Sequence, residues 1–226
     1  MSAGRLAVAR LGVVPYGDAR NRQRTLAEDR IAGRLASDAL LLLEHPSVVP
    51  LGRGTRASSL PIAPDLLKRR GIEVYEIERG GDVTYHGPGQ LVGYPIVTLP
   101  DGVYVVDYVR RLEEALLRTV GDYGLPAMRV PGRSGVWLPA SAERPERKVV
   151  AIGIRVSRKT TQHGFALNVS PDLAAFDRII PCGIEDAGVS SLAAELDDPP
   201  SMAEVATVAE RHLRDVLGFR GPTPKM

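Results

Sequence analysis

The sequence reads Arg79-Gly80-Gly81-Asp82-Val83-Thr84-Tyr85-His86-Gly87-Pro88-Gly89-Gln90 at its most glycine-rich point. Glycine lacks a Cβ atom and adopts positive φ without strain, so such a run is typical of a tight turn, a phosphate cradle or the wall of a substrate pocket. The flanking residues, 72–78 and 91–99, have the character of strands. Dinucleotide-binding and P-loop proteins place their glycine loop between a strand and a helix, so the phosphate cradle is the weakest interpretation.

Apolar patterning predicts the remaining elements. Before the loop we expect strands at 5–11, 39–44 and 48–51 and helices at 19–36 and 64–70. After it, apolar residues recur at helical spacing over 104–123, and Gly124 ends that helix. Further strands are expected at 136–138, 148–157 and 164–170, with a polar loop at 139–147, a turn at 158–163 and closing helices at 190–196 and 202–217.

These elements predict an α+β fold in which helices flank a mixed β-sheet. Strands and helices do not alternate strictly, which disfavours a Rossmann fold. No repeat or linker divides the chain, so we expect a single domain over residues 1–226 with its core at about 5–217. A chain of 226 residues that is 44% hydrophobic is large enough for one substantial core.

Composition narrows the class of protein. A formal net charge of +2 argues against a general binder of nucleic acid or anionic membranes. The longest apolar run, 39–43, is too short to span a bilayer, and residues 1–11 lack the apolar core of a signal peptide. The single cysteine excludes an internal disulfide and fits a reducing compartment, so we expect a soluble, cytoplasmic protein. The four histidines lie far apart in sequence, and no metal site is expected.

Two residues are candidates for covalent chemistry. Cys182 lies between Pro181 and Gly183, an arrangement that often presents an exposed nucleophile, although most lone cysteines are small buried hydrophobic residues. Lys148 begins an apolar strand in a chain with only four lysines, and its simplest interpretation is a charge at a strand end. If the two were neighbours, the ammonium would stabilise the thiolate, because a free cysteine has a pKa of about 8.5.

Other polar residues permit two interpretations each. His86 and His163 both precede a glycine, and either could position a catalytic group or cap a turn. No acidic or amide partner is identifiable by spacing, which gives little support to a Cys-His protease. Asn168 could bond the backbone near a strand end, and Tyr85 could be a core ring with its hydroxyl at the edge.

Several segments occur in a characteristic order: Glu44-His45-Pro46 with Leu51-Gly52-Arg53, the loop 79–90, Arg147-Lys148 with Ala151-Ile152-Gly153, His163-Gly164-Phe165-Ala166-Leu167-Asn168, Pro181-Cys182-Gly183-Ile184 and then Ser191. Together they resemble the lipoyl(octanoyl) transferase family over about residues 5–217. Pro50 departs from the family pattern, in which threonine is common at this position. The departure concerns only a local hydrogen bond near the loop.

The resemblance implies the catalytic-domain fold of lipoate and biotin protein ligases. It also implies transfer of an octanoyl group from the phosphopantetheine thiol of acyl carrier protein to a lysine of a lipoyl domain, as the first step of endogenous lipoylation. The implied acceptors are lipoyl domains of 2-oxoacid dehydrogenase E2 subunits and the glycine cleavage H protein. No ATP, metal or other cofactor, no nucleic acid and no membrane are implied, and we expect a monomer.

The family's site residues map onto this sequence. Cys182 would carry the acyl group as a thioester, and Lys148 would lower the pKa of its thiol and move protons. The substrate site would comprise Arg79, Gly80, Gly81, Asp82, Val83, Thr84, Tyr85, His86, Ala151, Ile152, Gly153, Gly164, Phe165 and Ala166. Small residues among them, such as Gly80, Gly81, Gly153 and Ala166, are expected to wall an apolar slot for the acyl chain, and backbone N–H groups near Gly183 or Gly153 are candidate oxyanion donors.

Two other functions remain open. An ATP-dependent lipoate or biotin ligase of the same fold would need a nucleotide-binding lysine and a phosphate loop, and it would have no need of Cys182. A non-catalytic protein that binds lipoyl domains or acyl chains would have little use for Cys182 paired with Lys148.

Overall fold

The computed structural model describes residues 4–142, 144–179 and 187–220. Cys182 and Gly183 lie outside the described residues. In chain order the strands are β1 Leu6–Val13, β2 Asp38–Glu44, β3 Val48–Leu51, β4 Glu73–Glu76, β5 Gln90–Ile96, β6 Met128–Val130, β7 Arg133–Leu138, β8 Arg147–Ser157, β9 Thr160–Asn168 and β10 Gly188–Val189. The α-helices are α1 Tyr16–Ile31, α2 Pro64–Arg69, α3 Val105–Gly121, α4 Leu192–Glu195 and α5 Met202–Leu217.

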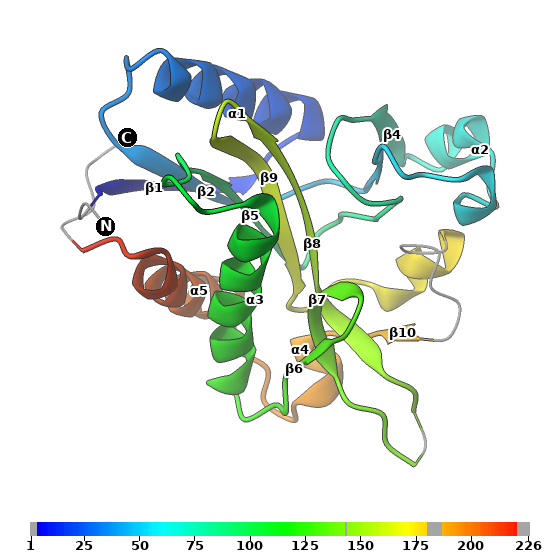
Figure 1. Cartoon of the computed structure of the whole chain (residues 1–226). Coiled ribbons are helices and arrows are strands. Elements are labelled where there is room, and N and C mark those ends of the chain that lie inside the picture. The colour runs from blue at the N-terminus through cyan, green and yellow to red at the C-terminus, as the bar shows by residue number, and fades with distance from the viewer. Residues whose placement is uncertain (1–3, 143, 180–186, 221–226) are drawn as a thin grey trace.

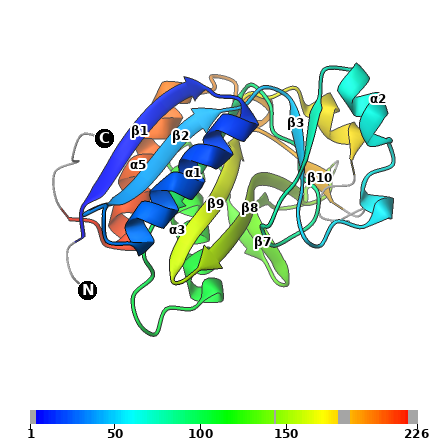
Figure 2. The ribbon, with the colours of Figure 1, turned by 90° about the horizontal axis from the view of Figure 1, so that it is seen from above.

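Within the described residues, eight strands form one mixed sheet in the order β1-β2-β5-β9-β8-β7-β6, with β10 alongside β8 (Figure 1). The pairs β1–β2 and β8–β10 are parallel, and the other pairs are antiparallel. Helices α3 and α5 cover one face of the sheet, and α1 covers the other (Figure 2). The expected α+β class with a mixed sheet and flanking helices is confirmed.

The sequence explains which face each helix covers. The apolar residues of α3 and α5 lie on one side of each helix and pack with the sheet in the main core, which includes Leu112, Leu116 and Leu213. Helix α1 is mostly polar, and its buried side chains are Tyr16, Ala19, Gln23 and Ala27. Ala19 packs against the apolar run of β2. The run 39–43 is buried throughout because helices cover both faces of β2.

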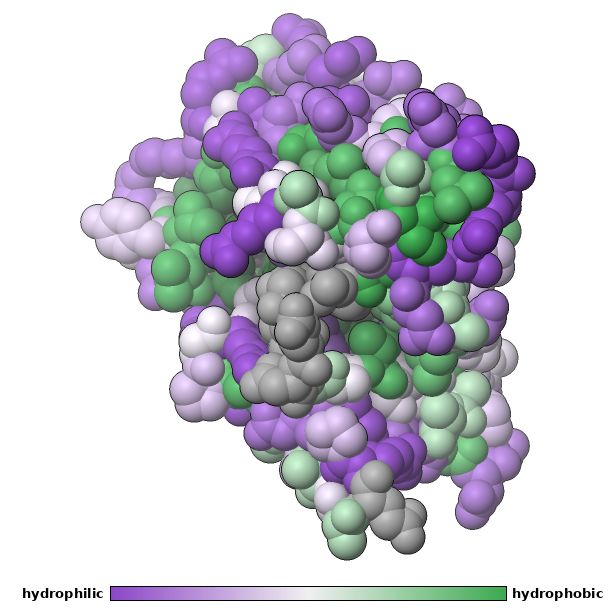
Figure 3. All heavy atoms as spheres, turned by 90° about the vertical axis from the view of Figure 1, so that its right-hand side faces the viewer, coloured by the Kyte–Doolittle hydropathy of each residue, from purple (hydrophilic) through white to green (hydrophobic). Residues whose placement is uncertain are grey.

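A second, smaller layer holds the glycine-rich loop. Strands β3 and β4 pair in parallel, and α2 packs with them in a separate apolar cluster that includes Leu67, Val83 and Tyr85. An isolated bridge between Val48 and His86 attaches the loop to β3. Hydrophobic side chains gather on the face formed by this small sheet and α2 (Figure 3). The loop therefore runs between the small layer and the main sheet.

Most predicted elements are confirmed to within a few residues, and the differences have local causes. The predicted turn at 158–163 is wrong. Arg158 and Lys159 both have positive φ and form a two-residue hairpin turn, so β9 already begins at Thr160. The helix predicted at 19–36 begins at Tyr16, directly after Pro15, and ends before Gly33, whose φ of 72° is left-handed.

Several short elements were missed. Strand β6 and the first half of β7 form a hairpin edge with little apolar alternation. Strand β10 has two residues, and the 3-10 helix Leu173–Arg178 lies in a region expected to be loop. Among the described residues, no helix is both long and apolar enough to cross a membrane.

Candidate active site

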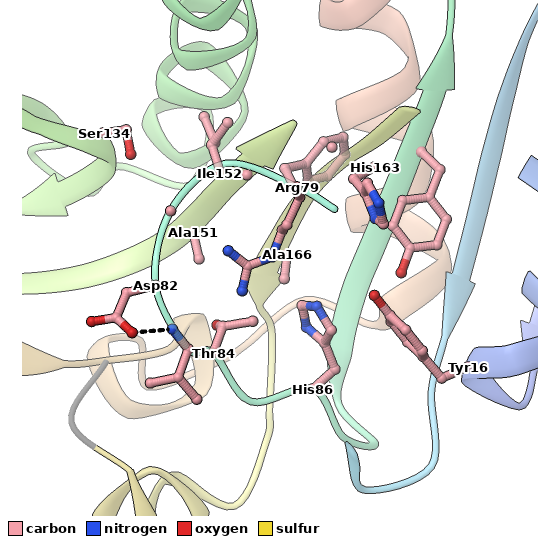
Figure 4. Close-up of a pocket in the computed structure, with 16 residues that line it drawn as sticks. Tyr16, Arg79, Asp82, Thr84, His86, Ser134, Ala151, Ile152, His163 and Ala166 are labelled. Atoms are coloured by element: carbon pink, nitrogen blue, oxygen red, sulfur yellow. Dashed lines mark hydrogen bonds between the residues drawn. The ribbon is translucent and has the colours of Figure 1, made fainter. Parts of the chain in front are cut away.

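A pocket lies between the glycine-rich loop, the middle of β8 and β9, and the start of α1 (Figure 4). It is lined by Tyr16, Arg79, Gly81, Asp82, Val83, Thr84, His86, Tyr94, Ser134, Ala151, Ile152, Gly153, His163, Gly164, Phe165 and Ala166. Twelve of the fourteen residues expected at a substrate site are among them. The antiparallel pairs Ala151–Ala166 and Gly153–Gly164 explain why segments distant in sequence meet in this pocket.

Two of the fourteen expected residues, Tyr85 and Gly80, do not line the pocket. The hydroxyl of Tyr85 lies 3.0 Å from Oγ of Ser47, and its ring packs edge-on against Phe176. Gly80 donates its backbone N–H to the carbonyl of Ile154 and thereby attaches the loop to β8. Both therefore shape the loop from behind, and the alternative interpretation of Tyr85 as a core ring is the one that the structure supports.

Sequence reasoning missed three residues of the pocket, and it did not place His163 there. Tyr16 precedes the predicted start of its helix, Tyr94 lies inside an apolar strand, and Ser134 belongs to the missed half of β7. None of the three has a local signal of function. The packing of α1 and β7 beside the loop brings Tyr16 and Ser134 to the pocket, and the pairing of β5 with β9 brings Tyr94 there.

Arg79 occupies the space that the glycines provide. Its side chain is 7% exposed, and its guanidinium donates to the carbonyls of Gly80 and Pro50 at 3.0 and 3.3 Å. A Cβ atom at Gly52 would lie 2.8 Å from Nη1 of Arg79, and one at Gly153 would lie 2.9 Å from its Cδ. The position that a Cβ atom of Gly153 would occupy therefore faces Arg79, and its role beside an acyl chain stays a prediction.

The loop is stabilised by its own polar groups. The carboxylate of Asp82 accepts from the backbone N–H of Val83 at 2.6 Å (Figure 4). It also accepts from the hydroxyl of Ser59 at 2.6 Å. The carbonyl of Pro50 also accepts from the backbone N–H of Thr84 at 3.2 Å. Because these bonds to residue 50 use its backbone carbonyl, proline in place of threonine leaves them intact.

Two buried histidines lie behind and beside the pocket. Nδ1 of His45 lies 2.7 Å from the carbonyl of Val14, which can only accept, so Nδ1 carries the proton and Nε2 accepts from the hydroxyl of Tyr94 at 2.7 Å. The rings of His45 and His86 are 5.8 Å apart, and both pack near Tyr16. In Figure 4 the side chains of His86 and Tyr16 lie next to each other on one side of Arg79.

Burial keeps these histidines neutral. Desolvation is the largest cause for each of them, and it lowers the pKa of His45 to about 4, that of His86 to about 3 and that of His163 to about 4. The charge of Arg79 contributes to the low pKa of His86 and of His163. Burial also raises the pKa of Tyr16 to about 12. At neutral pH the inner part of the pocket therefore holds uncharged rings beside one guanidinium.

A chain of hydrogen bonds leads from His86 across the sheet. His86 Nδ1 lies 3.0 Å from Oε1 of Gln90, whose Nε2 donates to the carbonyl of Tyr85 and to Oδ1 of Asn168. Asn168 donates in turn to the carbonyl of Ser190 at 2.8 Å. The orientation of Gln90 makes Nδ1 of His86 a donor, so Asn168 and Gln90 set the tautomer of His86.

The same chain reaches Lys148. The backbone N–H of Ser190 donates to the carbonyl of Lys148 at 2.9 Å, and Val189 pairs with Lys148 in the parallel β8–β10 register. Lys148 is 9% exposed, and its Nζ lies 4.5 Å from the centroid of the Trp137 ring. Strand β10 is thus fixed directly beside the lysine.

The described residues on either side of Cys182 lie close together. Ile179 and Ala187 line one hollow, together with Gly188 and Val189. Strand β10 follows Ala187 directly, and its second residue, Val189, pairs with Lys148. In the part of the chain that the structure describes, no group of three or more histidine, cysteine or acidic residues could hold a metal ion.

Comparison with known proteins identifies the class to which this fold and pocket belong. The lipoyl protein ligase A/B catalytic domain family matches residues 15–214. An octanoyltransferase of Mycobacterium avium is 54% identical over 93% of this chain and 86% of its own. An octanoyltransferase of Salinispora arenicola is 51% identical over 94% of this chain and 96% of its own.

Solved structures show the same fold at low identity. A lipoate protein ligase from Thermoplasma acidophilum has a TM-score of 0.72 at 19% identity, covering 99% of this chain and 87% of its own. A biotin protein ligase from Aquifex aeolicus has a TM-score of 0.56 at 13% identity, covering 93% and 70%. The expected lipoate and biotin ligase fold is confirmed.

The chain belongs to the lipoyl protein ligase A/B catalytic domain family. Its relatives also confirm the expected class of enzyme, an acyltransferase.

Proposed function

We propose that this enzyme transfers an octanoyl group from acyl carrier protein to the acceptor lysine of lipoyl domains, through a thioester on Cys182. The observation that carries the proposal is the pairing of Lys148 with Val189, because it fixes the chain that follows Cys182 beside a buried lysine. The octanoyltransferase names of relatives that are 51–54% identical support the acyl group and the reaction class. The acceptors are lipoyl domains of 2-oxoacid dehydrogenase E2 subunits and the glycine cleavage H protein.

In the first half of the reaction the Cys182 thiolate attacks the octanoyl carbonyl of the donor thioester. The bond between that carbonyl and the pantetheine sulfur breaks, and the leaving thiolate takes a proton from the ammonium of Lys148. The octanoyl group is now a thioester of Cys182, and Lys148 is neutral. No bond energy from ATP is needed, because one thioester replaces another.

In the second half the neutral amine of the acceptor lysine attacks the Cys182 thioester. The new carbon–nitrogen bond forms, the bond to Cys182 sulfur breaks, and the proton lost by the amine goes to Lys148. Cys182 is again a thiolate and Lys148 an ammonium. The amide is more stable than the thioester, which drives the reaction forward without a metal or other cofactor.

The pocket suits an apolar chain. Ile152, Phe165 and Ala166 contribute apolar walls, and the histidines beside them are uncharged at neutral pH. Burying roughly six methylene groups at ~0.8 kcal/mol each supplies on the order of 5 kcal/mol of binding free energy, so each methylene removed weakens binding about fourfold. We propose that the fourteen residues predicted from the resemblance act in substrate binding in two ways: twelve line the pocket, and Gly80 and Tyr85 act through the shape of the loop.

The test is intact-mass analysis of the enzyme with octanoyl-acyl carrier protein and no acceptor. We expect one octanoyl adduct on Cys182 that hydroxylamine removes and that Cys182→Ser abolishes. An apo lipoyl domain should then discharge the adduct without ATP. Active enzyme without an adduct would exclude the covalent mechanism, and an absolute requirement for ATP would favour a ligase of the same fold.

The same preparation tests the remaining parts of the proposal. Lys148→Ala should slow formation of the adduct and reduce the rate at which iodoacetamide alkylates Cys182 at neutral pH, because the thiolate loses its cation. An unchanged alkylation rate would remove Lys148 from this role. We further propose that the enzyme acts as a monomer in the cytoplasm, which sedimentation and cell fractionation would check.

A further inference from the structure

Strand β8 contains an irregularity next to Lys148. Val136 of β7 pairs with Val150, but the next residue, Trp137, pairs with Lys148, so Val149 is an extra residue on β8. An extra residue of this kind is a β-bulge, and it changes the direction in which the neighbouring side chains point. The bulge lies where β8 exchanges its partner β9 for β10, since Val150 is the first residue of β8 that pairs with β9.

The bulge decides which face of the sheet Lys148 occupies. Side chains alternate along a strand, so without the extra residue Lys148 would share the face of Val150, which packs in the main core. Trp137 lies between Val136 and Leu138, which both pack in that core, and its ring therefore lies on the opposite face. Because of Val149, Lys148 is directly opposite Trp137 and shares its face.

Gly135 completes a slot for the lysine side chain. Its φ of 112° strongly favours glycine, and a Cβ atom there would lie 2.3 Å from the carbonyl oxygen of Val150 and 3.6 Å from Cδ of Lys148. The stem of Lys148 therefore passes Gly135, and its Nζ lies 4.5 Å from the centroid of the Trp137 ring. Trp137 is 1% exposed, so water does not compete for that face of the ring.

We propose that Trp137 is a positioning residue for the reaction, and that it holds the ammonium of Lys148 by a cation–π contact. This inference rests on the proposed role of Lys148 as the proton carrier. A cation within about 6 Å of an indole face is attracted to it, and the attraction is stronger where water is excluded. The contact fixes the place of the ammonium, which supplies a proton in the first half of the reaction and is restored in the second.

The slot is held from the helix side by a buried carboxylate. Glu113 of α3 is 0% exposed, and its Oε1 accepts the backbone N–H of Gly135 at 3.1 Å. Arg110 and Arg129 neutralise the carboxylate through its Oε2. Glu113 therefore fixes the backbone of β7 beside Lys148, and its charge is balanced by these two arginines.

Other charged groups surround the pair. Cζ of Arg133 on β7 lies 5.8 Å from the centroid of the Trp137 ring. On β8, Arg147 forms an ion pair with Glu195 of α4 at 2.6 Å. Arg147 is thereby engaged by the carboxylate of Glu195, and Lys148 and Arg133 are the two cations that contact the Trp137 ring among the described residues.

Intrinsic fluorescence tests the contact without reference to catalysis, because Trp137 is the single tryptophan of the chain. We expect its emission intensity and maximum at pH 7 to differ between the wild type and Lys148→Met, a variant of similar side-chain length without the charge. Val136→Ala serves as a control, because it weakens the core next to Trp137 and leaves the ring and the lysine in place; it should keep the wild-type emission. Identical emission of the wild type and Lys148→Met would overturn the proposal.

Kinetics test the role. Trp137→Leu should lower kcat for octanoyl transfer about 3- to 10-fold with little change in KM, and Trp137→Phe should recover part of the loss because a benzene ring still attracts a cation. No recovery in Trp137→Phe, or an equal loss of kcat in Val136→Ala, would reduce Trp137 to a packing residue. If the wild type transfers no octanoyl group while the emission still differs between the wild type and Lys148→Met, the proposed function fails and the contact stands.

Discussion

A Cβ atom on Gly153 would lie 2.9 Å from Cδ of Arg79, closer than real Cβ contacts come. Because Gly153 in the middle of β8 has no side chain, it leaves room for Arg79, the first residue of the glycine-rich loop. Gly52, directly after β3, faces the same guanidinium, so two glycines distant in sequence leave room for one arginine. Arg79 in turn lines the pocket beside His86 and His163.

Gly153→Ala should displace Arg79 and lower both stability and octanoyl transfer. We expect a loss of about 1 to 3 kcal/mol in unfolding free energy, as for other overpacked sites, and a fall in activity of at least severalfold. Gly121→Ala is the matched control, because a Cβ there meets nothing within 4 Å and the residue lies at the end of a helix. Urea denaturation and transfer rates check both; equal behaviour of the two variants would contradict the fit between Gly153 and Arg79.

Acid should destabilise the enzyme through its buried histidines. The pKa values of His45, His86 and His163 are lowered from 6.5 to between about 3 and about 4 in the folded chain, so the unfolded chain binds more protons between pH 6.5 and 4. The stability from their neutral forms is complete above pH 6.5 and is lost as pH falls toward 4. We expect a loss of about 2 kcal/mol per histidine between pH 7 and pH 5.

Unfolding free energies from urea titrations at pH 7, 6 and 5 measure this loss. His86→Gln should reduce the pH dependence by roughly one third, because one titrating group is removed while a donor for Gln90 is retained. A wild type with the same unfolding free energy at pH 7 and pH 5 would be incompatible with three buried neutral histidines.

Gln90→Leu should break the hydrogen-bond chain at its centre. Leucine keeps the volume but leaves the Nδ1 proton of His86 and Oδ1 of Asn168 without this partner in a buried site, which costs about 2 to 4 kcal/mol of unfolding free energy. NMR of labelled histidine should show His86 losing its single tautomer. Gln162→Leu is the control, because Gln162 is only partly buried and accepts one long bond from Arg155, and it should cost less than about 1 kcal/mol.

Glu195→Gln should loosen β10 from Lys148. The carboxylate of Glu195 accepts from Nε and Nη2 of Arg147 and from the hydroxyl of Ser190, and the bond from Arg147 is the largest cause that lowers the pKa of Glu195 to about 2. The side chain of Glu195 is 6% exposed, so we expect a loss of about 2 to 3 kcal/mol in unfolding free energy. Hydrogen exchange should become faster at the Ser190 amide, which donates to the carbonyl of Lys148.

Glu114→Gln is the matched variant for this test. Glu114 also contacts two arginines, Arg118 and Arg129, but its side chain is 37% exposed, and solvent screens the pair. It should cost less than about 1 kcal/mol and leave exchange at Ser190 unchanged. Equal effects of the two substitutions would show that the Glu195 cluster does not hold β10.

The pattern of apolar residues and glycines along the chain was sufficient to predict the α+β fold class. The continuous apolar run of β2, the helical spacing in α3 and α5 and the glycine punctuation each follow from local burial, and their order sufficed to exclude a Rossmann fold. Prediction failed where local signals are weak or misleading. The two-residue turn at Arg158 and Lys159 is built from residues that usually avoid positive φ, and the edge strands β6 and β10 are too short to show a period.

The candidate site, like the fold, could be predicted from the sequence only in part. The sequence by itself determined which residue types are available: the glycines of the loop, Lys148 and, through the resemblance to a known family, twelve residues that line the pocket from the loop and from the adjacent strands β8 and β9. Only the tertiary structure decided that Gly153 accommodates Arg79, that Tyr16 and Tyr94 join the histidines, and that Lys148 faces Trp137. The reason is physical: these contacts join residues from different elements, and the last depends on one extra residue in β8, which reverses the face of a strand without leaving a mark on local composition.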